Sequence, residues 1–271
     1  MSSVRQRARQ ALIAYNALLG PLLAVAFIAS GNPFLAIPAI LFGHAFWMYS
    51  TLVPHCAWFG EVVTHVRDID GSASASSVWL TIDDGPHPED TPALLDLLDE
   101  FGARATFFFI GRNAAANPDL VREVIARGHG LGNHTMTHPH FRYWAYGPAA
   151  LRREVTACRE LLRSLSGRDV RIFRAPAGLK NPFLQRVLER DGVRLIGWSS
   201  RGLDGIRTDR DEINARIRTS LRPGGIVLVH EGRADESGQR LAPDILRSVL
   251  EELRARGLRA ELPGQGATAE S

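Results

Sequence analysis

The stretch SVWLTIDDGPHPEDTPALLDLLDEFG, residues 77–102, joins a short apolar run to a segment with the leucine spacing of a helix. The run SVWLTIDD has the length and composition of a buried strand. Leucines then recur at helical spacing from Leu94 to Leu98, and Thr91-Pro92 marks the first turn of that helix. A strand followed by a helix is the unit from which parallel α/β sheets are built.

The same unit recurs along the rest of the chain. Further apolar runs of strand type begin near residues 104, 129, 171, 194 and 225, and a segment of helical periodicity follows each of them. This alternation predicts an α/β fold with a parallel sheet and outer helices. Periodicity alone does not choose between a closed barrel and an open, doubly wound sheet.

The first sixty residues have a different composition. Residues 11–60 contain no Asp, Glu, Lys or Arg, and Gly31-Asn32-Pro33 divides them into two apolar pieces. Each piece approaches the length of about 20 residues that a helix needs to cross a bilayer. We therefore expect a transmembrane helical hairpin over residues 1–60, with spans at about 11–30 and 34–54.

Two other interpretations of this region remain open. Arg5, Arg7 and Arg9 before an apolar stretch also fit a cleaved secretory signal, and a buried helical hairpin is the third choice. The second apolar piece favours the transmembrane hairpin. Basic residues before the first span place the N-terminus in the cytoplasm, and two spans return the chain there. The expected location is a bacterial-type inner (plasma) membrane, with a cytoplasmic catalytic domain and the lipid bilayer as a partner.

Polar segments delimit the remainder of the chain. Residues 61–77 have the composition of a linker, the main domain is expected over 78–263, and residues 264–271 form a flexible tail. The 32 basic and 29 acidic residues give a net charge of only +3 and are interleaved. Nucleic acid is therefore not an expected partner, and the oligomeric state is left open.

Polar residues stand where the apolar runs end. In chain order they are Asp83, Asp84, His134, His138, Arg174, Asp204 and His230. The carboxyl ends of parallel strands meet at one edge, where ligands bind in barrels and open sheets alike. These residues therefore predict a functional site at that edge.

The histidines and the paired carboxylates suggest a metal. A separation of four residues places His134 and His138 on one side of a helical turn, within reach of one ion. One carboxylate of Asp83-Asp84 would complete a two-histidine, one-carboxylate set that leaves positions open for water and substrate. Iron(II) oxygenases use the same set, but on a different, jelly-roll-like architecture.

The motifs LTIDDGP, HTMTH, FRAPAG and LVH, in this order, resemble those of the polysaccharide deacetylase family, also called carbohydrate esterase family 4 or the chitooligosaccharide deacetylase homology domain. The resemblance covers roughly residues 78–263. It implies a distorted (β/α) barrel and a divalent metal held by Asp84, His134 and His138. Zn²⁺ is the first choice, and Co²⁺, Mn²⁺, Ni²⁺ or Fe²⁺ also suit nitrogen and oxygen donors.

The resemblance also implies catalytic roles. By position they are Asp83 as general base, Arg174 as the residue that orients it, His230 as general acid, and Asp204 as its partner. A backbone N–H near Ala177, next to Pro176, would help the metal to stabilise the oxyanion. His140 falls outside the His-x-x-x-His pattern and is expected to be a loop residue near the rim.

Two positions depart from the family's pattern. Ala177 stands where many members have an aromatic residue, and Gly205 follows Asp204 where tryptophan is usual. The second change leaves Asp209 and Asp211 as competitors for the role of Asp204. Both changes remove apolar surface from the expected groove. We therefore expect a substrate other than a long chitin-like or peptidoglycan strand.

The expected function is a metal-dependent hydrolase that removes an N-acyl group, first of all acetyl, from an amino sugar. Activated water attacks, with Asp83 as base and His230 as acid. A cytoplasmic site would favour an acylated glycolipid or another acylated small molecule made at the inner leaflet. The alternatives are an O-acetyl esterase with the same site and a catalytically silent, membrane-anchored carbohydrate-binding protein.

Overall fold

The computed structural model describes residues 18, 21–31, 34, 36–70 and 76–264 of the chain. Residues 21–29 are helical, and α2 (Ala36–Leu52) and α3 (Arg67–Asp70) follow. The elements that follow are β1 (Ser77–Asp83), α4 (Asp90–Glu100), β2 (Ala105–Phe109), α5 (Gly111–Ala116), α6 (Pro118–Ala126), β3 (Gly130–Asn133), η2 (His140–Ala145), α7 (Pro148–Ser166), β4 (Ile172–Phe173), η3 (Pro176–Gly178), α8 (Leu184–Arg190), β5 (Arg194–Leu195), β6 (Ser200–Arg201), α9 (Arg210–Ser220), β7 (Ile226–His230), α10 (Ala242–Ala255) and β8 (Arg259–Ala260).

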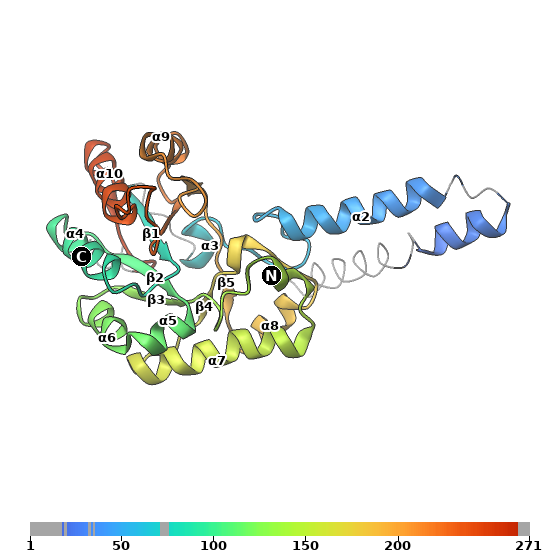
Figure 1. Ribbon diagram of the computed structural model, residues 1–271, viewed down its shortest axis with the longest axis horizontal. Coiled ribbons are helices and arrows are strands. Elements are labelled where there is room, and N and C mark those ends of the chain that lie inside the picture. Colours follow the sequence, from blue (N-terminus) through green and yellow to red (C-terminus); the bar gives the residue numbers. More distant parts are fainter. Residues whose placement is uncertain (1–17, 19–20, 32–33, 35, 71–75, 265–271) are drawn as a thin grey trace.

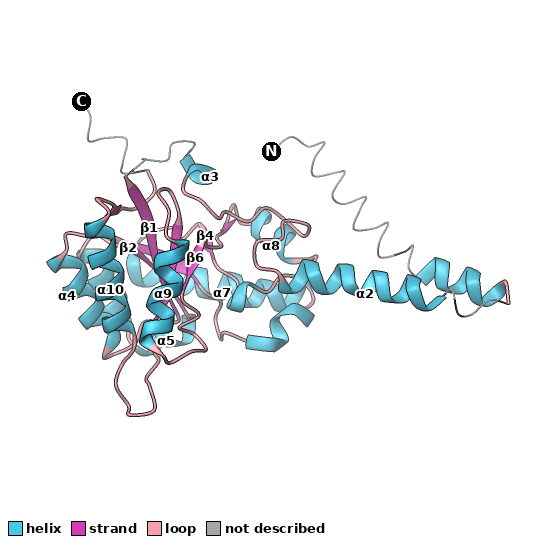
Figure 2. Ribbon diagram, turned by 90° about the horizontal axis from the view of Figure 1, so that it is seen from above, coloured by secondary structure: helices cyan, strands magenta, loops and turns pink. Residues whose placement is uncertain are grey.

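The strands form one curled parallel sheet. Their order is β5-β4-β3-β2-β1-β7-β6, and β8 pairs with β1 beside this row. Helices α4, α6, α7, α9 and α10 surround the sheet (Figures 1 and 2). The prediction of an α/β barrel is confirmed in the form of a half-barrel. In the register of β1 and β7, Asp83 pairs with His230, so these two residues stand side by side at the carboxyl edge.

Alternation along β2 explains how the sheet is packed on both faces. Successive side chains of a strand point to opposite faces. Phe107 and Phe109 therefore belong to the cluster shared with the outer helices, whereas Phe108 joins Trp79 and Trp198 in a separate inner cluster. Because both faces are covered, the sequence of this strand does not alternate between apolar and polar residues, and its one polar side chain, Thr106, is buried and accepts from the Trp79 indole at 2.8 Å.

The segment expected to be a single strand near residue 194 is divided. Its two parts, β5 and β6, lie at opposite ends of the sheet, and residues 196–199 cross the open side between them. Residues 62–66, here called the closing segment, fill the opening. Val63 donates to the Leu195 carbonyl at 2.9 Å and accepts from the Gly197 N–H at 2.7 Å, and Val66 donates to the Gly224 carbonyl at 2.9 Å.

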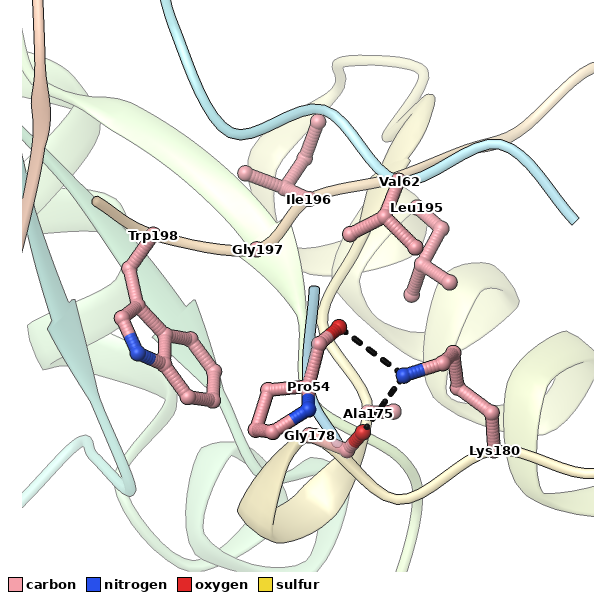
Figure 3. A pocket seen from close by; sticks show the side chains of 9 residues that line it. All are labelled: Pro54, Val62, Ala175, Gly178, Lys180, Leu195, Ile196, Gly197 and Trp198. Atoms are coloured by element: carbon pink, nitrogen blue, oxygen red, sulfur yellow. Dashed lines mark hydrogen bonds between the residues drawn. The ribbon is translucent and has the colours of Figure 1, made fainter. Parts of the chain in front are cut away.

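Lys180 holds the chain just before the closing segment. It is the only lysine of the chain, and its buried ammonium donates to the Val53 carbonyl at 2.8 Å. It also donates to the Pro54 carbonyl at 2.8 Å and to the Gly178 carbonyl at 3.3 Å (Figure 3). Burial lowers the pKa of Lys180 to about 8. The three acceptors satisfy all three donors of the ammonium, so this contact ties the end of α2 to the barrel.

The expectation of a two-span membrane hairpin was wrong, and with it the inner-membrane location. No helix in the described parts of the chain is long and apolar enough to cross a membrane. The second expected span corresponds to α2, whose 17 residues rise about 26 Å, less than a hydrocarbon core of about 30 Å. Much of the first expected span, including residues 11–17, lies outside the described residues, as does the tail at 265–271.

Replacing Lys180 with methionine tests the tie between α2 and the barrel. The change keeps the apolar stem but leaves three carbonyls without their donor. We expect the free energy of unfolding in urea to fall by about 2 kcal/mol. Arg168→Met, at an exposed position, serves as the control and should stay close to the parent. Equal stability of all three proteins would show that the Lys180 contacts do not stabilise the fold.

Candidate active site

Asp83 and Asp84 lie at the end of β1 and reach the same cavity. Two neighbouring residues of a strand would point to opposite faces. Here Asp84 adopts a left-handed backbone with φ of 78°, so the chain turns before its side chain projects. The Asn113 amide donates to the Asp84 carbonyl at 2.8 Å and helps to hold this conformation, which costs energy in a residue other than glycine.

The two histidines approach each other through a loop rather than the expected helical turn. His134 directly follows β3, and Thr135 and His138 both have positive φ, at 68° and 50°. The Asn133 side chain accepts from the Thr135 N–H at 2.9 Å, and the Thr135 hydroxyl accepts from the His138 N–H at 3.0 Å. These side-chain contacts satisfy the backbone that would otherwise lie buried without partners.

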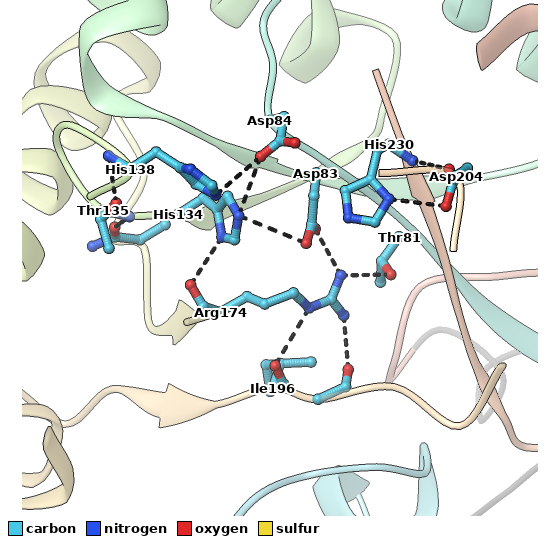
Figure 4. A network of polar contacts seen from close by, with 12 residues as sticks. Thr81, Asp83, Asp84, His134, Thr135, His138, Arg174, Ile196, Asp204 and His230 are labelled. Carbon is cyan, nitrogen blue, oxygen red and sulfur yellow. Dashed lines mark hydrogen bonds and ion pairs between the residues drawn. The ribbon is translucent and has the colours of Figure 1, made fainter. Parts of the chain in front are cut away.

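The structure brings Asp84, His134 and His138 together as a candidate metal site (Figure 4). Asp84 Oδ1 lies 3.4 Å from the Nε2 atoms of both histidines, and this buried oxygen accepts no hydrogen bond from any described residue. Ligands about 2.1 Å from a tetrahedral ion stand about 3.4 Å apart. His134 Nδ1 lies 2.9 Å from the Arg174 carbonyl, which orients its Nε2 toward Asp84. The donor set therefore fits a divalent metal such as Zn²⁺.

The protonation states of these groups also suit a metal. Burial, and then the neighbouring His134, lower the pKa of His138 to about 3, so its ring is neutral at pH 7. Burial alone would raise the pKa of Asp84, but the His134 contact and then the charge of His230 outweigh it and hold that pKa below its usual range. A neutral imidazole and an ionised carboxylate are the forms that bind metal ions.

Arg174 fixes the second carboxylate. Its Nη1 donates to Asp83 Oδ1 at 2.7 Å and to the Thr81 hydroxyl at 2.8 Å. Its Nη2 donates to the Gly197 carbonyl at 2.8 Å, and its Nε donates to the Ile196 carbonyl at 3.3 Å. The guanidinium is fully buried, so its position and that of Asp83 are fixed together.

His230 and Asp204 form a pair on the other side of Asp83. Asp204 Oδ1 lies 2.9 Å from His230 Nδ1, and Oδ2 accepts from the His230 backbone N–H at 2.6 Å. Burial would lower the pKa of His230, but the Asp204 charge and hydrogen bond raise it to about 9. The two competing acids lie elsewhere: Asp209 caps α9 by accepting from the Glu212 N–H, and Asp211 is exposed.

Pro176 and Ala177 form the short turn η3 after β4. Ala177 is exposed and has a positive φ of 53°. Its N–H has no hydrogen-bond partner within the part of the chain that the structure describes. This donor is therefore available to a ligand at the rim.

Sequence reasoning missed the residues that support Arg174. Thr81 precedes Asp83 by two positions and so faces the same side of β1, which is the signal that was available. The Ile196 and Gly197 carbonyls carried no signal, because any residue type offers a carbonyl.

His140 is exposed, with its ring edge-on to His138 at 4.4 Å between centroids, and it is not part of the candidate metal set.

Comparisons with known proteins point to one family. The family model described as polysaccharide deacetylase matches residues 70–196. A chitooligosaccharide deacetylase of Azorhizobium caulinodans is 36% identical over 191 residues, 67% of this chain and 90% of the relative. The solved Bc1960 peptidoglycan N-acetylglucosamine deacetylase has a TM-score of 0.65 at 26% identity, over 74% of this chain and 89% of its own. A family 4 carbohydrate esterase from Streptomyces lividans, in complex with acetate, has a TM-score of 0.62 at 29% identity, over 72% and 97%.

Neighbouring histidines allow a matched test of the metal site. We expect His138→Ala to weaken Zn²⁺ binding by at least about 100-fold, because one of three protein ligands is lost. His140→Ala removes an equal ring two residues away and should change the dissociation constant less than about 3-fold. Competition with a chelating dye measures both. Equal losses in the two variants would contradict the assignment of His138 alone.

Proposed function

The chain belongs to the polysaccharide deacetylase family, and on this premise we propose that it is a carbohydrate de-N-acetylase, a hydrolase that removes an N-acyl group from an amino sugar. The observation that carries the proposal is the grouping of Asp83, held by Arg174, with the Asp84, His134 and His138 set on one side and His230 on the other. This grouping contains a base, an acid and a metal site within one edge of the sheet.

A metal held by Asp84, His134 and His138 would supply a Lewis acid and lower the pKa of a bound water. Asp83 is placed to take a proton from the attacking water. Its Oδ1 is engaged by Arg174, whereas its Oδ2 faces the metal set, 3.9 Å from His134 Nε2. We therefore assign the proton to Asp83 Oδ2, with Arg174 as the positioning residue.

His230 is suited to protonate the leaving amine. Because its Nδ1 is directed at Asp204, the proton for the substrate must come from Nε2. With a pKa of about 9 the ring is charged at neutral pH and can act as a general acid. The Ala177 N–H serves as an additional donor to the oxyanion that forms during attack.

The substrate is proposed to be a small N-acetylated amino sugar rather than a long polymer. A side chain at position 205 would lie on the His230 ring, since a Cβ there meets the ring atoms at 3.4 Å. Gly205 and Ala177 leave this region without an aromatic wall. Without a membrane hairpin, no feature of the described residues favours a glycolipid over a free sugar.

Acetate release tests the function. Zn²⁺-loaded protein should release acetate from N-acetylglucosamine or short chitooligosaccharides, and Asp83→Asn should lower kcat by about 100- to 10,000-fold because the base is lost. Asp211→Asn, an exposed carboxylate on α9, is the control and should match the parent. Release only from O-acetylated sugars would favour an esterase. No release from either class by protein with one metal per chain would overturn the proposal.

The Asp204–His230 pair predicts a pH effect. The raised pKa keeps His230 protonated up to about pH 9, so kcat should decline above that value. Asp204→Asn removes the charge that favours imidazolium, so the pKa falls and the decline should begin about one to two pH units lower. Asp209→Asn is the matched control and should keep the parent profile. An unchanged profile in Asp204→Asn would mean that another group sets the basic limb.

A further inference from the structure

Arg201 is a partly buried cation that no described carboxylate or carbonyl oxygen engages. It lies at the end of β6, and within the described ranges its guanidinium forms neither a hydrogen bond nor an ion pair shorter than 4 Å. Other partly buried arginines are engaged by carboxylate or carbonyl oxygens; these are Arg104, Arg127, Arg159, Arg194, Arg210 and Arg240. A guanidinium removed in part from water needs acceptors, so the free donors of Arg201 suit a ligand.

Trp198 connects this cation to the catalytic edge. The Arg201 guanidinium lies 5.2 Å from the centre of the Trp198 ring, and the Arg174 guanidinium lies 5.9 Å from it. The same indole packs close to Gly178, the residue after Ala177 (Figure 3). Arg201 is also near Asp204, whose two oxygens are already engaged by His230. Arg201 therefore stands beside the proposed acid and oxyanion groups without belonging to either.

His55 lies on the same indole and is exposed. Its ring centroid is 5.9 Å from that of Trp198, and the two rings meet edge to face. Burial, followed by the charges of Arg201 and Lys180, lowers its pKa. The pKa of Arg201 is in turn lowered by burial and then by Arg216. Arg201, Arg216 and Lys180 carry positive charge in this region, and the opposing Asp204 carboxylate is already engaged by His230, so a bound anion would be favoured here.

We propose that Arg201, assisted by His55, binds the phosphate of a phosphorylated N-acyl amino sugar whose acyl group lies at the catalytic edge. This inference rests on the proposed function, and it names the substrate class. A guanidinium presents paired donors that match phosphate oxygens. Ala177 and Gly205 offer no aromatic surface to a sugar ring, so a charged contact provides the recognition that stacking does not.

Calorimetric binding to the Zn²⁺-loaded full chain provides the test, because it needs no turnover. The probes are N-acetylglucosamine 1-phosphate and N-acetylglucosamine. We expect the parent to bind the phosphorylated sugar about 10- to 100-fold more tightly. Arg201→Met should abolish this preference and change the affinity for the unphosphorylated sugar less than about 2-fold. Arg168→Met, which removes an exposed arginine, should retain the preference.

Several results would overturn the phosphate site. They are equal binding of both sugars by the parent, an undiminished preference in Arg201→Met, and a matching preference for N-acetylmuramic acid, which carries a carboxylate instead. A preference that depends on Arg201 in a protein that releases no acetate would support the site while the deacetylase proposal fails. A prenyl-diphosphate-linked N-acetylglucosamine in detergent separates the sources: tighter binding than the 1-phosphate indicates a lipid-linked phosphate, and equal binding indicates a free sugar phosphate.

Discussion

The buried ion pair between Arg174 and Asp83 is the contact on which the catalytic edge depends. Both groups are almost fully removed from water, and an unpaired charge in such a place would cost several kcal/mol. The pair therefore forms as a unit, and it links three parts of the fold. Arg174 follows β4, Asp83 ends β1, and the Arg174 carbonyl meets His134 after β3. One residue thus positions the proposed base and orients a proposed metal ligand.

The open side of the half-barrel takes part in the same network. Residues 196–199 cross it, and the Ile196 and Gly197 carbonyls accept from the Arg174 guanidinium. Those residues are held from the other side by the closing segment, where Val63 bonds with the neighbouring Leu195 and Gly197. A chain segment that precedes the first strand therefore contributes to the catalytic edge through two hydrogen-bonded layers. Closure of the barrel and placement of the base are parts of one arrangement.

Local signals explain what the sequence could predict. Apolar runs followed by helical periodicity were sufficient for the parallel α/β fold, because these patterns reflect burial on both faces of a sheet. The polar residues of the site could be predicted as well, because they directly follow these apolar runs. The division of the segment near residue 194 into β5 and β6 was not predicted, because Ile196, Gly197 and Trp198 continue the apolar run and give no sign that the strand ends at Leu195. The loop path of His134 to His138 depends on side-chain contacts from Asn133 and Thr135, and spacing alone cannot distinguish it from a helical turn.

Two features of the site depend on tertiary contacts: the acid that pairs with His230, and the surface that would recognise a substrate. Asp204, Asp209 and Asp211 are close in sequence, but Asp204 is the one that lies beside His230. Sequence spacing alone could not predict which of the three acids makes this contact. Gly205 and Ala177 present no aromatic side chain of their own at the catalytic edge, whereas Arg201, which forms no ion pair with any described residue, places a guanidinium near it. Stacking on a sugar ring is insensitive to salt, but a charged contact is screened over a Debye length of about 8 Å at physiological ionic strength. A partly buried guanidinium is screened less than an exposed one, so the position of Arg201 against Trp198 would preserve its attraction for the proposed phosphorylated substrate.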